Sequence, residues 1–470
     1  MRNKHMISEV EQMKFEYETH LDSPRRDVFD WFEHKGSFRR LMPPWEVAEE
    51  VRADDTLEDG AQRVFRFPMG PIKMTWVAEH LGYEPPEKFE DIMRKGPFSS
   101  WHHVHRFIEK DGSTIVHDEV NYRLPMGILG RIFGSRNVRN RLNRMFRARE
   151  LRLIRDLQRH SDFREMPRKR ILLAGASGLI GRQLSAFLDT GGHEIWRLVR
   201  RPPRDNANEI EWNPNKGEID SKSVEGFDIV IHLGGAGIGD RRWTKKRKAL
   251  IKQSRIESTG LLAETLAALT DKPDVFLVAS AIGWYGNRGD ETLTESSHVG
   301  EGFLPDTCVA WESSAEPARA AGIRTIHTRT GVVLDACGGA LQKMLLPAKM
   351  GAGGPIGFGR QWFSWISMDD EIYAIHHLIM SPDSEGVYNL TSPQPMQQKF
   401  FAKALGRVLR RPAFIPTPPL AIWFLYGRMG VSLTTESQRV MPERLIDSGY
   451  RFEHSNAEDA LRDALGKWKR

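Results

Sequence analysis

The stretch "RILLAGASGLIGRQLSAFL", which begins at Arg170, constrains the fold of this chain more than any other segment. An apolar run leads into three glycines, and an apolar-periodic segment follows them. Glycines at this spacing permit a tight turn, a close approach of the backbone to a pyrophosphate, and close helix–strand contact. The N-terminus of the following helix presents free N–H groups to phosphates. We therefore predict a dinucleotide-binding turn formed by Gly175, Ser177, Gly178, Leu179, Ile180 and Gly181.

The end of the next predicted strand, in "HEIWRLVRRPPR", indicates which dinucleotide is preferred. Sites that prefer NAD carry an Asp or Glu about 20 residues beyond the glycine turn. This chain has Arg200 and Arg201 at that distance. Arginines favour the 2′-phosphate of NADP, where a charge-assisted hydrogen bond contributes about 1.5–3 kcal/mol. We predict NADP as the cofactor, with a solvated basic turn as the alternative reading of the two arginines.

Apolar strands alternate with helical segments after Arg170, which predicts an α/β, Rossmann-like, doubly wound parallel sheet. Ligands bind such sheets at the carboxyl ends of the strands. "FDIVIHLGGAG" ends in the small-residue turn that contains Leu233 and Gly234, which we place beside the cofactor. "VFLVASAIGWYG" brings Ser280 and Tyr285 to the same edge. These two are the catalytic candidates, although Tyr285 also suits a structural position in the core.

A chain of 470 residues, with about a third of it before the glycine turn, predicts two domains. The front part alternates like antiparallel strands, with a helix after the first strand, capped by Ser23, and a long Arg-rich helix over 135–160. This order predicts an α+β domain in which a curved sheet wraps a terminal helix. "SDFREMPRKR" (161–170) is the predicted linker, so the domains are 1–162 and 169–470, with substrate binding in about 330–470.

Other features of the sequence bear on binding partners and on cellular location. Trp101, His102, His103 and His105 suggest a metal centre, but no acidic or cysteine partner stands at ligand spacing, so strand packing is the interpretation and no metal is predicted. The net charge of +6 comes with no nucleic-acid-binding motif. Two cysteines and an N-terminus without an apolar run predict a cytoplasmic protein without a transmembrane segment. The sequence identifies no oligomeric state.

Residues 170–465 resemble the atypical extended short-chain dehydrogenase/reductases (SDRs) of the nucleoside-diphosphate-sugar epimerase-like family. The resemblance is carried by "GASGLIG", "LVRR", "HLGGAGI", "SRIEST", "SAIGWYG", "RTGVVLDACGGAL" and "GVYNLTSPQP". It implies that Arg200, Arg201, Leu233, Gly234 and Arg255 contact NADP beside the glycine turn. It also implies an oxidoreductase or epimerase that acts on a small-molecule substrate, which the sequence does not identify.

The chain departs from this family at the catalytic pair. Ordinary extended members use Tyr-x-x-x-Lys, in which the tyrosine is the acid/base. The corresponding positions here are Leu304 and Cys308. Ser280 and Tyr285 then remain as catalytic candidates, and Arg329, Trp365 and the glycine-rich segment 351–359 as a pocket wall and flap. Whether the protein is an enzyme stays open, and the alternative is a non-catalytic NADP-binding sensor or scaffold.

The front part resembles the START-like, helix-grip family that includes polyketide cyclases. "SPRRDVFDWF", "GPFSSWHHVHRF" and "DEVNYRLPMG" carry this resemblance over residues 13–160. Members of that family enclose an apolar cavity between sheet and helix, which implies a hydrophobic small-molecule ligand for the front domain.

Overall fold

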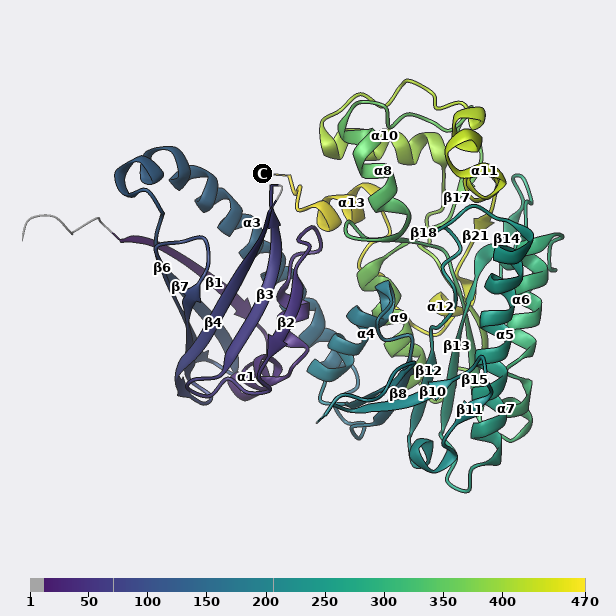
Figure 1. Cartoon of the computed structure of the whole chain (residues 1–470), viewed down its shortest axis with the longest axis horizontal. Coiled ribbons are helices and arrows are strands. Elements are labelled where there is room, and N and C mark those ends of the chain that lie inside the picture. Colours follow the sequence, from purple (N-terminus) through teal and green to yellow (C-terminus); the bar gives the residue numbers. More distant parts are fainter. Residues whose placement is uncertain (1–11, 71, 206, 470) are drawn as a thin grey trace, which may run out of the picture. The chain divides into compact units, whose positions relative to one another are not determined.

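The computed structural model describes residues 12–70, 72–205 and 207–469, without the side chains of 69, 127–133 and 425. The N-terminal residues 1–11, on which the expectation about a leader rests, lie outside this description. The contacts divide the chain into two compact units (Figure 1). The first comprises residues up to Arg164 together with Asp189–Gly192, and the second comprises Glu165–Leu188 and His193–Arg470.

The first unit is a seven-stranded antiparallel sheet with the strand order β1-β7-β6-β5-β4-β3-β2, accompanied by three helices (Figure 1). Its elements are β1 (Met13–Leu21), α1 (Arg25–Glu33), α2 (Ser37–Leu41), β2 (Glu49–Ala53), β3 (Gln62–Met69), β4 (Ile72–Glu84), β5 (Lys88–Lys95), β6 (Ser100–Lys110), β7 (Ser113–Arg123) and α3 (Gly127–Ser161). This α+β arrangement confirms the fold predicted for the front part.

The first unit folds around one buried face of its sheet. Burial along β7 alternates residue by residue, as a half-buried strand requires. Helix α3 packs one apolar face against the sheet. Its buried hydrophobic residues recur at helical spacing and include Leu142, Phe146, Leu153 and Leu157. Helix α1 begins after Pro24, which takes the N-cap position without a side-chain hydrogen bond, so the predicted cap at Ser23 is wrong.

The second unit contains an eight-stranded sheet with the order β11-β10-β9-β8-β12-β13-β15-β19, parallel except for the β10–β11 pair. Its strands are β8 (Arg170–Ala174), β9 (Glu194–Val199), β10 (Glu209–Asn213), β11 (Glu218–Ile219), β12 (Ile229–His232), β13 (Val275–Ala281), β15 (Arg324–Thr330) and β19 (Gly386–Leu390). This sheet confirms the predicted doubly wound fold.

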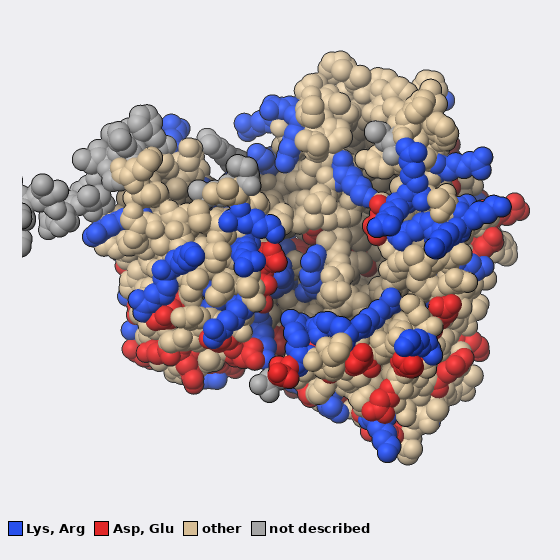
Figure 2. Space-filling model, in the orientation of Figure 1, with Lys and Arg blue, Asp and Glu red and all other residues tan. Residues whose placement is uncertain are grey.

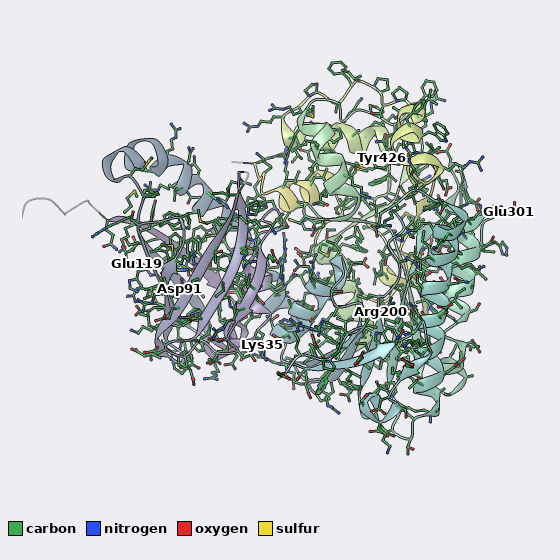
Figure 3. All side chains as sticks on the ribbon, viewed as in Figure 1. Lys35, Asp91, Glu119, Arg200, Glu301 and Tyr426 are labelled. Atoms are coloured by element: carbon green, nitrogen blue, oxygen red, sulfur yellow. The ribbon has the colours of Figure 1, made fainter. Side chains whose placement is uncertain are left out.

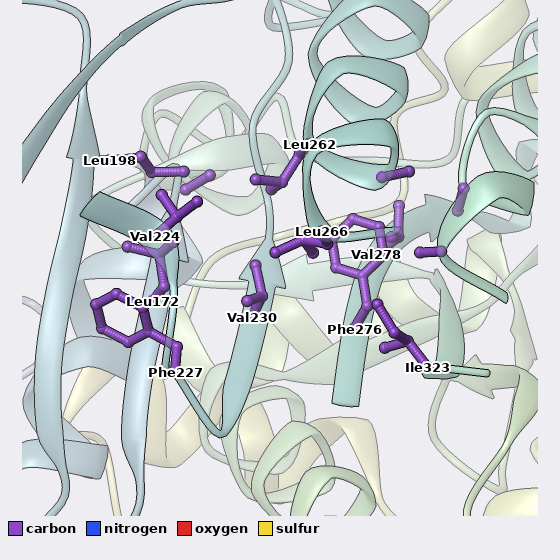
Figure 4. Packing of buried hydrophobic residues seen from close by; sticks show 14 of the residues in the cluster. Leu172, Leu198, Val224, Phe227, Val230, Leu262, Leu266, Phe276, Val278 and Ile323 are labelled. Carbon is purple, nitrogen blue, oxygen red and sulfur yellow. The ribbon is translucent and has the colours of Figure 1, made fainter. Parts of the chain in front are cut away.

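Helices cover both faces of the parallel sheet. Figure 1 shows α4 (Leu179–Thr190) and α9 (Met368–Met380) on one face, and α5 (Lys245–Ala268), α6 (Phe303–Ser313) and α7 (Glu316–Ala320) on the other. Because both faces are covered, the central strands read as continuous apolar runs. Figure 4 shows Leu262 and Leu266 of α5 beside Val230 and Phe276 of the sheet. Each such side chain contributes about 1.5–3 kcal/mol by leaving water.

The C-terminal part of the second unit has a core of its own. Its elements include short strands β16 (Val332–Leu334) and β18 (Trp365–Ser367) and helices α8 (Gly339–Lys349), α10 (Gln398–Leu409) and α13 (Ala457–Leu465). Trp365 lies fully buried in this core with Phe401 and Leu461, so the prediction that Trp365 lines a pocket wall is wrong. None of the helices formed by the described residues has the length and apolar character needed to cross a membrane.

Candidate functional site

The predicted dinucleotide turn lies between β8 and α4, and its glycines are sterically required. Gly175 has φ +89°, and a Cβ there would lie 2.8 Å from the carbonyl carbon of Leu233. A Cβ on Gly181 would lie 2.2 Å from the Gly175 oxygen. The Gly178 N–H donates to that same oxygen at 2.9 Å, which closes the turn. Helix α4 begins at Leu179, directly after the exposed residues Ser177 and Gly178, so its N-terminus lies at the turn.

The C-terminal part of the second unit approaches the same turn. Gly338, just before α8, lies against Leu179, and a Cβ on Gly338 would be 2.4 Å from Leu179 Cδ1. Lys343 of α8 donates to the carbonyl oxygen of Gly239 at 2.5 Å. The predicted substrate-binding part therefore packs directly on the glycine turn.

The end of β12 holds a histidine that sequence reasoning missed. Strand β12 ends in His232, which is fully buried and has no hydrogen-bond partner at either ring nitrogen among the described residues. Burial lowers the pKa of His232 to about 4. Leu233 and Gly234, the residues predicted to lie beside the cofactor, follow it and contact Gly175. A polar residue that closes an apolar strand at the carboxyl edge was the available signal.

Arg255 of α5 is a buried cation beside the turn that follows β12. Its Nη1 donates to the carbonyl oxygens of Ala236 at 3.0 Å and Ile251 at 2.9 Å, and its guanidinium lies 4.8 Å from the Trp311 ring centroid. Within the described chain, Arg255 forms no ion pair with a carboxylate, and its Nε has no hydrogen-bond partner. Burial lowers the pKa of Arg255 to about 10. A buried guanidinium without a carboxylate suits a phosphate oxygen.

The two arginines after β9 differ in their surroundings. Arg201 donates to both carboxylate oxygens of Glu209, at 2.7 and 2.9 Å, and Arg204 donates to the same carboxylate at 2.8 Å. Arg200 is exposed and makes no hydrogen bond or ion pair with any residue that the structure describes (Figure 3). Figure 2 shows further basic side chains on the visible face of the second unit. The predicted pair thus consists of one guanidinium available to a ligand and one already held by Glu209.

These residues fit a nicotinamide dinucleotide. The glycine turn leaves a space that any Cβ would fill, which suits a pyrophosphate. The start of α4 and Arg255, which has no carboxylate partner among the described residues, can donate hydrogen bonds to it. Once bound, the nicotinamide ring would supply hydride transfer.

A buried hydrogen-bond network joins the two catalytic candidates. Ser280 Oγ donates to Glu312 Oε1 at 2.6 Å, and Arg329 donates to both Glu312 oxygens at 2.9 Å. Tyr285 is fully buried, its hydroxyl donates to Asn389 Oδ1 at 2.8 Å, and it accepts from Arg329 Nη1 at 3.1 Å. Burial raises the pKa of Tyr285. Arg329 therefore belongs to this buried network and does not line the pocket wall that the sequence predicted.

The positions that correspond to Tyr-x-x-x-Lys lie next to this network. On α6, Leu304 Cβ and Cys308 Sγ would lie 3.3 and 3.7 Å from a Cβ on Gly283. The Cys308 thiol faces the carbonyl oxygen of Ala281 at 3.7 Å, and burial raises its pKa to about 12. The site of the usual acid/base is thus apolar and neutral here.

A second ionisable residue that the sequence did not single out lies at the end of β15. Glu371 of α9 is almost completely buried; its Oε1 accepts from Thr330 Oγ1 at 2.9 Å, and its Oε2 has no partner among the described residues. Burial raises the pKa of Glu371 to about 8. This carboxyl holds its proton at neutral pH.

The histidine cluster of the first unit has acidic partners after all. Strand pairing sets Asp91 of β5 opposite His103 of β6, and Asp118 of β7 opposite His105. Oxygen–nitrogen distances within this group are 3.2 Å for Asp91–His103 and 3.0 Å for Asp118–His103. The expectation that no acidic residue lies at ligand spacing is therefore wrong, because the partners come from neighbouring strands.

Comparison with known proteins adds to this geometry. A family model described as "NAD dependent epimerase/dehydratase family" matches residues 171–305. An epimerase family protein of Mycobacterium bovis is 38% identical over 292 residues, which is 62% of this chain and 96% of the relative. The chain belongs to the epimerase family. A relative from Bacillus subtilis, 35% identical over 303 residues, covers 64% of this chain and 99% of its own length.

Other matches concern the two ends of the chain. A model described as "Polyketide cyclase / dehydrase and lipid transport" matches residues 21–146, and a domain of unknown function matches 417–464. The polyketide cyclase match confirms the resemblance predicted for the front part, and the epimerase-family matches confirm the one predicted for the second part.

Two solved structures of epimerase-family proteins are similar. The nucleoside-diphosphate sugar epimerase from Corynebacterium glutamicum is 31% identical, with a TM-score of 0.80 over 96% of this chain and 90% of that one. The human epimerase family protein SDR39U1, solved with NADPH, is 30% identical, with a TM-score of 0.59 over 63% of this chain and 99% of that one.

Proposed function

We propose that the second unit is an NADPH-dependent oxidoreductase or epimerase-like enzyme that acts on a small-molecule substrate. The nicotinamide dinucleotide follows from the family and the glycine cradle. One observation supports the preference for the 2′-phosphate. The carboxylate of Glu209 is already paired with Arg201 and Arg204, whereas the neighbouring Arg200 has no partner among the described residues. SDR39U1, a similar protein, was solved with NADPH.

We expect the chain to hold the dinucleotide as follows. Backbone groups of Gly175, Ser177, Gly178, Leu179, Ile180 and Gly181 bind the pyrophosphate, with Arg255 beside the turn that follows β12. Leu233 and Gly234 leave room for the ribose. Arg200, with Arg201, binds the 2′-phosphate. Ser280 and Tyr285 act on the substrate side, where the Glu312–Arg329 ion pair fixes the Ser280 hydroxyl and the tyrosine orientation.

Isothermal titration calorimetry with NADPH and NADH tests this proposal. We expect NADPH to bind at least tenfold tighter, which corresponds to about 1.4 kcal/mol. Arg200→Ala removes the preference, while Arg201→Ala has a smaller effect because its charge is shared with Glu209. Arg197→Ala, an exposed arginine earlier on β9, is the matched control and leaves both affinities unchanged. Equal affinities of the wild type for the two cofactors would refute the NADP assignment.

A non-catalytic NADPH sensor or scaffold is the second candidate function. It is favoured by the apolar pair Leu304 and Cys308 at the usual acid/base positions, and by the buried hydroxyl of Tyr285. NADPH oxidation measured against a panel of carbonyl compounds and nucleotide sugars distinguishes the two. Tight NADPH binding without turnover of any substrate supports the sensor.

We further propose that the first unit binds a hydrophobic small molecule. Aromatic rings gather on the inner side of its sheet, where half-buried Trp76 lies 5.3 Å from buried Trp101 and 5.9 Å from half-buried Phe98 between ring centroids. Quenching of tryptophan fluorescence by a titrated long-chain fatty acid tests this, and unchanged fluorescence counts against it. A cytoplasmic location remains a prediction, supported by Cys308 and Cys337, which do not form a disulfide with each other.

A further inference from the structure

The buried histidines of the first unit form an arrangement with two distinct sides. Asp91 (Figure 3), His103, His105 and Asp118 come from the adjacent strands β5, β6 and β7 and turn their side chains to the same inner face. The two imidazoles lie 3.8 Å apart between ring centroids. Each ring points one nitrogen at Asp118 and the other at Asp91.

On the Asp118 side, one carboxylate oxygen faces a nitrogen of each ring. His103 Nε2 lies 3.0 Å from Asp118 Oδ1 in a hydrogen bond. His105 Nδ1 lies 2.6 Å from the same oxygen, outside hydrogen-bond angles. Only the His103 contact has hydrogen-bond geometry, so the His103 Nε2 proton points at Asp118. Asp118 thereby fixes the orientation of His103 and turns its Nδ1 toward Asp91.

On the Asp91 side, the other nitrogen of each ring faces the second carboxylate. His103 Nδ1 lies 3.2 Å and His105 Nε2 lies 3.7 Å from Asp91 Oδ2, and the three ligand atoms all lie within 4.8 Å of one another. Metal–ligand bonds of about 2.0–2.2 Å place neighbouring ligand atoms roughly 3–3.6 Å apart. A protonated His103 can donate to both carboxylates without a metal, and a divalent cation between the three ligand atoms would take the place of that proton.

We propose that Asp91, His103 and His105 bind one divalent first-row transition-metal ion such as Zn²⁺, with Asp118 as the residue that orients His103. Two histidines and one carboxylate form a known ligand set for such ions and leave coordination positions open. A carboxylate that accepts from the far nitrogen of a metal-bound histidine is the usual supporting partner. The open positions would accept an oxygen donor of the small molecule bound by this unit.

The surroundings of the three ligands favour a fixed geometry. The Phe89 ring stacks on His105 at 4.3 Å, and Phe146 lies 5.7 Å from His103, so neither ring is free to turn. His80 on β4 pairs with Asp91 across the strands and is buried with no partner for Nδ1 among the described side chains, but it is not among the three residues whose ligand atoms lie within 4.8 Å of one another. Arg63 and Arg149 are two further cations that interact electrostatically with Asp91. Without a metal, these arginines and a protonated histidine would balance the negative charge of the two carboxylates.

The test uses the untagged full-length protein, stripped with a chelator and dialysed. Co²⁺ titration followed by visible absorption, and Zn²⁺ titration against a chromophoric chelator, should each give one equivalent. Asp91→Asn and His105→Gln should abolish stoichiometric binding. Asp118→Asn should retain the site but weaken it about 10–100-fold, as expected for an orienting partner.

His102→Gln is the matched control, because His102 lies on the same strand but on the other face, bonded to Glu90. It should bind the metal like the wild type. Circular dichroism of each variant separates loss of a ligand from loss of the fold, and Asp118→Asn keeps the test decisive if a ligand variant unfolds. Absence of one tight equivalent in the wild type, or equal binding by folded Asp91→Asn, overturns the proposal.

Discussion

Replacing Glu371 by glutamine should change how the stability of the second unit depends on pH. Burial raises the pKa of this carboxyl from 4.5 to about 8 in the folded protein, against a smaller opposing effect of the Thr330 hydrogen bond. Between these two pH values the folded state keeps a proton that the unfolded state has released. Stability therefore falls as the pH rises through this window. At about 1.36 kcal/mol per pKa unit, the loss approaches about 5 kcal/mol by pH 8.

Glutamine is neutral at every pH and can still accept from Thr330, so Glu371→Gln should remove this slope. We expect the variant and the wild type to differ little at pH 5, and the variant to be more stable by up to about 5 kcal/mol at pH 8.5. Chemical denaturation at pH 5, 6, 7, 8 and 8.5 measures the difference. Glu264→Gln, at an exposed position of α5, is the control and should show a constant difference. A difference between Glu371→Gln and wild type that does not change with pH would refute the reasoning.

Three further predictions concern the second unit and the linker. Gly181→Ala places a Cβ 2.2 Å from the Gly175 oxygen and should weaken NADPH binding by about 1–3 kcal/mol in calorimetry; Gly260→Ala on α5, where nothing lies within 4 Å, should leave it intact. Tyr285→Phe should keep NADPH affinity and lower turnover about 10²–10⁴-fold if the hydroxyl is the proton donor, whereas a fall in melting temperature with unchanged turnover would assign it a structural role. Limited proteolysis followed by mass spectrometry should find the first cut between Ser161 and Arg170, giving two fragments that each stay folded, and an earlier cut inside either fragment would argue against independent domains.

The parts of the fold that were predictable are those encoded by local periodicity. The glycine turn, the apolar strands around it and the amphipathic helix over 135–160 each show their structure within a window of about 20 residues. Their packing follows from which faces are apolar. Helix ends are less certain, because Pro24 and Ser23 both suit the start of α1 and only the backbone conformation decides between them.

The features that the sequence did not predict depend on contacts between residues far apart in the chain. Asp91 and Asp118 reach the histidines only through the register of three antiparallel strands, which a linear spacing cannot show. Arg201 looks the same as Arg200 in the sequence, yet Glu209 binds only the second of the two. The absence of the catalytic Tyr-x-x-x-Lys pair could be predicted, because the family resemblance shows that Leu304 and Cys308 occupy its two positions.

The contact between Gly338 and Leu179 limits how members of this family can be recombined. A chimera that joins the nucleotide-binding half of one protein to the C-terminal half of another brings together a helix start and a loop that were never selected as a pair. A Cβ on residue 338 would lie only 2.4 Å from the Leu179 methyl group, so alanine at position 338 would require the leucine side chain to move. Residues 179 and 338 should therefore be exchanged together, and a crossover placed between them should carry a matched residue at both positions.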